Sequence, residues 1–90
     1  MYFALFYTTV ENFIERRQPL REAHLAHARR SHQDGHLVLA GALQPPDAAL
    51  LVFRADSATP VEDFARNDPY VASGLVKSWR VREWTVVIGG

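Results

Sequence analysis

The stretch YFALFYTT, at residues 2–9, is a β-rich run with apolar side chains at both of its alternating positions. Side chains alternate between the two faces of a strand, so Phe3 and Leu5 point to one face. Ala4 and Phe6 then point to the other face. A strand that is apolar on both sides belongs to a sheet that is covered on both faces.

The rest of the chain predicts a strand, helix, strand, strand, helix and strand in that order. The expected elements are a strand at 2–9, a helical turn at 11–17, a helix at 19–33, strands at 37–43 and 48–53, a helix at 60–67 and a strand at 77–88. This order is typical of the α+β class. It predicts a ferredoxin-like βαββαβ fold in one domain over residues 1–90, with two helices on one face of an antiparallel sheet.

Local signals set the ends of the two longer helices. Pro19 suits the first turn of the first helix, and Gly35 can adopt the left-handed conformation that follows a helix. The sequence TPVE at residues 59–62 matches a capping box, in which the threonine accepts a backbone N–H and the glutamate reaches back. The second helix is expected to end near Asn67, because Pro69 restrains the residue before it.

Two helices can cover only one face of this sheet, although residues 37–40 and 50–53 are also apolar on both sides. An uncovered second face would expose a larger apolar patch than monomers usually show. Two-fold dimers are the commonest oligomers, so the sequence predicts a homodimer formed through the sheet face. Trp79 and Trp84 are expected on opposite faces of the final strand, one in the core and one in the interface.

Composition excludes several classes of function. Ten Lys and Arg balance ten Asp and Glu, and this zero formal charge argues against a nucleic-acid partner. The absence of cysteine rules out disulfides, thiolate zinc sites and a cysteine nucleophile. No apolar run approaches the roughly 20 residues of a membrane span. The opening MYFA lacks the basic start of a secretory signal, so a cytoplasmic protein without membrane contact is expected.

All four histidines lie in or just after the first long helix, at positions 24, 27, 32 and 36. Leu20, His24 and Ala28 form one stripe of that helix, so His24 is expected to face the sheet. Because the stripe has few large apolar groups, it is suited to line a cavity. The alternative is a half-buried histidine with a backbone partner. A metal shared by His24 and His27 would need a third ligand that the spacing does not demand, so no metal is predicted.

Asp68 is the carboxylate that could act with His24. A carboxylate bonded to one imidazole nitrogen fixes the tautomer and leaves the other nitrogen free to take or give a proton. The alternative is that Asp68 only organises the turn after the second helix. Arg17 or Arg21 could hold an anionic group of a substrate, or could belong to a solvated basic face. Ser73 could bring a hydroxyl to the same region.

Three motifs resemble the signature of the YciI-like (YCII-related) family. They are RxxHL at residues 21–25, HQDGHL at 32–37 followed by AG at 40–41, and DPYVASG at 68–74. The resemblance covers nearly the whole chain and implies a dimeric α+β barrel. It also implies a catalytic pair of His24 and Asp68 in a cavity, with Arg17 and Ser73 as substrate-binding residues and with no cofactor.

The resemblance further implies acid–base chemistry on a hydroxylated aromatic or ring-cleavage-type substrate. Elimination, such as dehydrochlorination, or isomerisation fits a chain without a cofactor motif or an activated nucleophile. The alternative function is a non-catalytic dimer that binds a metabolite or serves as an accessory protein. The sequence departs from the family at Gly41–Ala42, where Gly-Pro is usual, and in the short connection at 44–47. The identity of the substrate therefore does not carry over.

Overall fold

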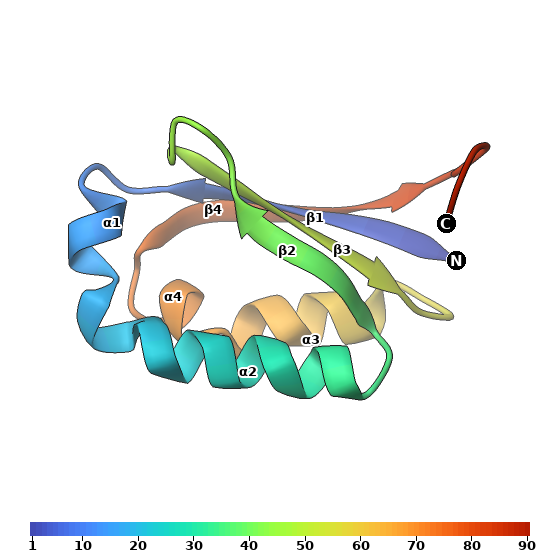
Figure 1. The fold of residues 1–90 in the computed structure, drawn as a ribbon, viewed down its shortest axis with the longest axis horizontal. Coiled ribbons are helices and arrows are strands. Elements are labelled where there is room, and N and C mark those ends of the chain that lie inside the picture. Colours follow the sequence, from blue (N-terminus) through green and yellow to red (C-terminus); the bar gives the residue numbers. More distant parts are fainter.

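The computed structural model describes all 90 residues and contains a four-stranded antiparallel sheet with the strand order β2-β3-β1-β4. In chain order the elements are β1 (Tyr2–Thr9), α1 (Phe13–Arg16), the 3-10 helix η1 (Gln18–Leu20), α2 (Arg21–Gln33), β2 (Leu37–Ala42), β3 (Ala48–Arg54), α3 (Thr59–Asn67), α4 (Pro69–Ala72) and β4 (Val76–Trp84). Figure 1 shows α2 and α3 on the same side of the sheet. This is the α+β ferredoxin-like fold that the sequence predicts.

β1 lies at the centre of the sheet and carries the core on one face. Leu5 lies opposite Leu51 of β3 and Val81 of β4, so these residues share the inner face. The odd-numbered residues of β1 from Phe3 to Thr9 are all buried, as the alternation predicts. α3 packs against this face, where the rings of Phe53 and Phe64 meet edge-on at 5.0 Å between centroids.

The outer face of the sheet is uncovered in the single chain. Phe6, Leu39 and Trp84 lie on it, with 37%, 61% and 48% of their surface exposed. Trp79 instead packs against the core on the inner face. The prediction that the two tryptophans face opposite sides is therefore confirmed. Large apolar side chains gathered on one uncovered face are typical of an interaction surface.

The start of α3 differs from the prediction. The helix begins at Thr59, so Ala58 occupies the N-cap position and makes no side-chain hydrogen bond. The backbone N–H groups of Val61 and Glu62 donate to the Ala58 carbonyl instead. The predicted capping box is wrong, because the threonine lies inside the first turn rather than before it.

The first long helix also starts later than predicted. It was expected from Pro19, but Pro19 lies in the 3-10 helix η1 and α2 begins at Arg21. Gly35 follows α2 with φ of +86°, which confirms the predicted left-handed helix end. β4 ends at Trp84, whereas the sequence predicted a strand to Ile88. Its neighbour in the sheet is β1, whose first residue Tyr2 pairs with Trp84, so no further partner is available. None of the helices combines the length and apolar character that crossing a bilayer requires.

α2 packs loosely on the sheet. None of its 13 residues is buried, whereas α3 buries three of its nine. Leu20 and Ala28, on the predicted stripe, are partly buried at the margin of the core. Because small and polar side chains face the sheet here, the helix leaves space between itself and the strands.

Candidate active site

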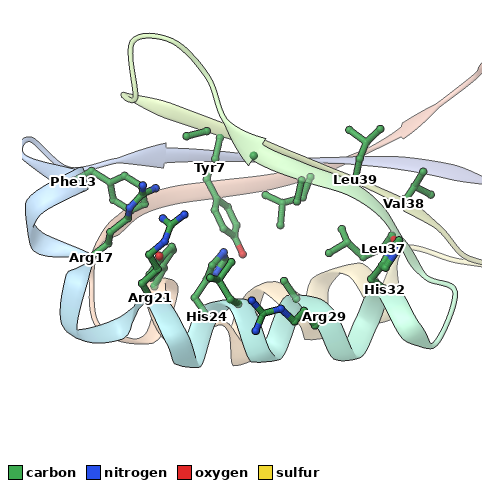
Figure 2. A pocket seen from close by; sticks show the side chains of 18 residues that line it. Tyr7, Phe13, Arg17, Arg21, His24, Arg29, His32, Leu37, Val38 and Leu39 are labelled. Carbon is green, nitrogen blue, oxygen red and sulfur yellow. The ribbon is translucent and has the colours of Figure 1, made fainter.

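A cavity of about 450 Å³ lies between α2 and the inner face of the sheet. Figure 2 shows Tyr7 reaching into it from the sheet and His24 from the helix, with Arg17 and Arg21 near one end and Leu37 near the other. Twelve of its 18 lining residues are hydrophobic, and none is an aspartate or glutamate. The volume is that of a site for a small organic molecule.

Asp68 lies behind the cavity wall, and its side chain is fully buried. Its Oδ1 accepts hydrogen bonds from His24 Nδ1 at 2.8 Å and from the Tyr70 backbone N–H at 3.0 Å. Its Oδ2 accepts from the Tyr7 hydroxyl at 2.7 Å. The bond to Tyr70 makes Asp68 the N-cap of α4. Three donors compensate the loss of water around this carboxylate, which would otherwise be costly to bury.

His24 connects Asp68 to the cavity. Because the carboxylate accepts from Nδ1, that nitrogen carries the proton of the neutral ring. Nε2 makes no hydrogen bond within the chain, and 15% of the side chain is exposed. The ring stacks on Tyr70 with 3.9 Å between centroids and 8° between planes. The imidazole is thus fixed in orientation, with one nitrogen able to take or give a proton.

Tyr7 is a site residue that the sequence analysis missed. It comes from the inner face of β1, lines the cavity and donates to Asp68. Burial, together with the charge of Asp68 and the hydrogen bond to it, raises the pKa of the Tyr7 hydroxyl, which therefore stays a donor at neutral pH. The alternation of β1 contained the signal, since Tyr7 shares the inner face with Leu5. A buried tyrosine hydroxyl usually finds a hydrogen-bond partner, which made a polar group near Tyr7 an expectation open to the sequence.

The arginines that could hold an anion lie on the cavity wall. Arg17 and Arg21 line it, as does Arg29 of α2. None of the three forms an ion pair with a carboxylate. The guanidinium of Arg17 lies over the Phe13 ring, 5.4 Å from its centroid. The cavity therefore combines an apolar wall with several unneutralised positive charges.

Ser73, His27 and His32 each have a backbone carbonyl as hydrogen-bond partner, and of the three only His32 lines the cavity. Ser73 is exposed and does not line the cavity, because it closes the C-terminal end of α4 and its hydroxyl donates to a backbone carbonyl of that turn. The predicted substrate contact of Ser73 is therefore not supported. His27 Nε2 lies 2.9 Å from the Phe64 carbonyl, and His32 Nδ1 lies 2.8 Å from the Leu37 carbonyl. No group of three His, Cys, Asp or Glu is placed to hold a metal ion.

Two proteins are among the solved structures that share this architecture. One is the 5-chloro-2-hydroxyhydroquinone dehydrochlorinase of Burkholderia phenoliruptrix in complex with 2,5-dihydroxybenzoquinone, with a TM-score of 0.79, 21% identity and coverage of 94% of both chains. The other is a candidate antibiotic biosynthesis monooxygenase from Deinococcus radiodurans, with a TM-score of 0.57, 15% identity and coverage of 99% of this chain and 97% of that one. At these identities the likeness shows the fold alone, an antiparallel sheet with helices on one face.

Comparison of the sequence with family models assigns the chain to a family independently of its fold. No curated protein sequence matches the chain. The sequence model of the YCII-related domain, however, matches residues 1–85. These residues include the helix that carries His24 and the corner that carries Asp68. The chain therefore belongs to the YCII-related family.

Proposed function

We propose that this protein is an enzyme that performs acid–base chemistry on a small organic molecule. His24 is the proton-transfer group, and Asp68 orients it and stabilises the imidazolium that forms. The observation that carries the proposal is the 2.8 Å contact between Asp68 and His24 Nδ1, with the opposite nitrogen unpaired beside the cavity. Proton transfer by a positioned group accelerates reactions by roughly 10²–10⁴. Tyr7 supports the pair as a positioning residue, because its hydroxyl holds the second oxygen of the carboxylate.

The proposed reaction is elimination or isomerisation of a hydroxylated aromatic or ring-cleavage-type substrate, without an organic cofactor. Support comes from the dehydrochlorinase that shares the fold and acts on 5-chloro-2-hydroxyhydroquinone. Loss of HCl from such a ring moves one hydroxyl proton to the carbon that bears chlorine. A second hydroxyl proton then leaves as the C–Cl bond breaks and chloride departs with the bonding pair. Both steps need a group that accepts and returns protons near neutral pH, as imidazole does.

The proposed enzyme is a homodimer whose sheets pack face to face. The outer face exposes Phe6, Leu39 and Trp84, and a hollow of about 290 Å³ lies between Phe6 and Trp84. A second copy covers this surface with an identical apolar one, which is the arrangement that two-fold symmetry produces. The dimeric α+β barrel type of the structural neighbours supports the same assembly.

Chloride release from 5-chloro-2-hydroxyhydroquinone tests the proposed chemistry. His24→Ala and Asp68→Asn are each expected to lower kcat by roughly 10²–10⁴, because the first removes the proton-transfer group and the second its orienting charge. His36→Gln is the control, since this exposed histidine lies outside the cavity and its replacement should leave the rate unchanged.

Two results would count against the enzyme. Undiminished turnover in both His24→Ala and Asp68→Asn would remove the pair from the mechanism. Saturable binding of the hydroquinone without any turnover would instead favour the alternative, a non-catalytic dimer that binds a metabolite.

A further inference from the structure

Two buried donors near one end of the cavity have no partner within the chain. They are Nε of Arg17 and the hydroxyl of Tyr70, the two buried side-chain polar atoms that make no hydrogen bond. Both side chains lie against Phe13: the Arg17 guanidinium is 5.4 Å from its ring centroid, and the Tyr70 ring meets it edge-on at 5.3 Å. Buried polar groups in proteins are nearly always paired, because an unpaired one is costly. Because both side chains also line the cavity, these two unpaired donors point to a ligand there that accepts hydrogen bonds.

The charge of the cavity wall is one-sided. Arg17, Arg21 and Arg29 line the cavity together with His24 and His32, and no carboxylate does. None of the three guanidinium groups has a carboxylate within ion-pair distance. The whole chain has a formal charge of zero, so this excess of positive charge is local. Such a local excess in an apolar hollow favours the entry of anions.

Tyr70 can serve as a neutral donor at this end. Burial and the charge of Asp68 raise the pKa of its hydroxyl, although the charges of Arg17 and Arg21 and the approach of the Arg21 guanidinium to the hydroxyl oxygen act in the opposite direction. The hydroxyl therefore keeps its proton at neutral pH, and this proton is left without an acceptor in the chain. The Tyr70 ring also stacks on the imidazole of His24. A substrate group bound to the Tyr70 hydroxyl would thus lie close to the imidazole of His24, the proposed proton-transfer group.

We infer that Arg17, Arg21 and Tyr70 form a carboxylate-binding subsite, and that the substrate is an organic acid whose ring extends along the apolar wall past His24. A guanidinium presents paired N–H groups that match the two oxygens of a carboxylate. The hydroxyl of Tyr70 adds a donor from another element. The inference rests on the proposed function in one respect, which is that the substrate occupies this cavity. It adds that the substrate carries a carboxylate.

Binding of three probes with the same ring tests the subsite. They are 2,5-dihydroxybenzoate, its neutral carboxamide and hydroquinone, each titrated calorimetrically into the wild-type protein. We expect the acid to bind at least roughly tenfold more tightly than either neutral probe, as one charge-assisted hydrogen bond allows. Arg17→Gln, Arg21→Gln and Tyr70→Phe should each reduce this preference, and each should leave hydroquinone affinity within about twofold. Equal binding of acid and carboxamide, or no saturable binding of the acid, would overturn the inference.

Two further variants separate the subsite from general charge effects. Arg16→Gln removes a neighbouring exposed charge that does not line the cavity, so the preference for the acid should stay complete. A loss as large as that in Arg17→Gln would show a long-range effect and refute the subsite. Arg17→Lys keeps the charge and the packing but loses the paired N–H geometry, so an intermediate preference is expected. A full preference in this variant would refute the paired contact.

The outcome is independent of turnover. His24→Ala should retain the preference for 2,5-dihydroxybenzoate, because it leaves Arg17, Arg21 and Tyr70 in place. A His24→Ala variant that reacts as fast as the wild type would therefore remove the proposed chemistry and leave the subsite standing. A wild-type protein that shows no preference for the acid would refute the subsite and leave the proposed chemistry standing.

Discussion

Tyr7→Phe is expected to destabilise the protein, because it removes one of the three donors to Asp68. The hydroxyl donates to Oδ2 at 2.7 Å, and both residues are almost fully buried. A buried hydrogen bond to a charged group contributes about 1.5–3 kcal/mol, and its loss leaves a carboxylate oxygen without a partner. We expect the free energy of unfolding to fall by about 2 kcal/mol. For a chain of this size, that lowers Tm by roughly 8–16 °C.

Tyr70→Phe is the matched control for this prediction. It removes a hydroxyl from a tyrosine that is also buried, but this hydroxyl has no hydrogen-bond partner within the chain. Its loss should leave the free energy of unfolding unchanged or slightly higher. Urea unfolding, followed by tryptophan fluorescence near pH 7, measures both variants against the wild type. Equal destabilisation by the two substitutions, or none by Tyr7→Phe, would refute the assignment of the Tyr7–Asp68 bond.

Two other predictions concern pH and assembly. Burial and the charge of Asp68 raise the pKa of Tyr7 above the value of 10.0 that applies to an unfolded chain, so the unfolded chain releases this proton first as pH rises. The free energy of unfolding of the wild type should exceed that of Tyr7→Phe by a constant amount below pH 10. Above pH 10 this difference should shrink by up to about 1.4 kcal/mol per pH unit. Urea unfolding at pH 9 to 11 measures it, and a difference that stays constant over this range would contradict the prediction. Leu39→Asp should convert the proposed dimer to a monomer in analytical ultracentrifugation, whereas Ile14→Asp, at an exposed apolar site on α1, should not. Equal effects of the two would argue against the sheet interface.

The fold was largely predictable from the sequence, because its strands and helices carry strong local signals. The double-sided apolar pattern of β1 marks a central strand, and Gly35 and Pro69 mark the ends of the helices on either side of β2 and β3. The capping box failed because the same four residues fit a helix that begins one position earlier. Such one-residue shifts depend on tertiary packing of the first turn, which a local pattern does not record.

The candidate site was predictable only in part. His24 stood out through its place on a stripe poor in large apolar groups, and Asp68 through the corner that follows α3. Tyr7 was missed because an aromatic residue in a core strand has an ordinary packing explanation. The sequence predicted that Ser73 lines the cavity, but Tyr70, three residues earlier in the same segment, lines it instead. Which residue of so short a turn faces inward depends on how α4 packs on β4, and spacing alone does not give this.

One oxygen of Asp68 accepts two hydrogen bonds, one from the backbone amide of Tyr70 at the start of α4 and one from the imidazole of His24. The position of the His24–Asp68 contact therefore depends on the backbone conformation at Asp68, the N-cap of α4. A protein engineer who wished to graft the histidine–aspartate pair onto another scaffold would have to transplant the Asp68-Pro69-Tyr70 corner intact. The same coupling means that a substitution at position 68 would disturb both the start of α4 and the proposed proton-transfer pair.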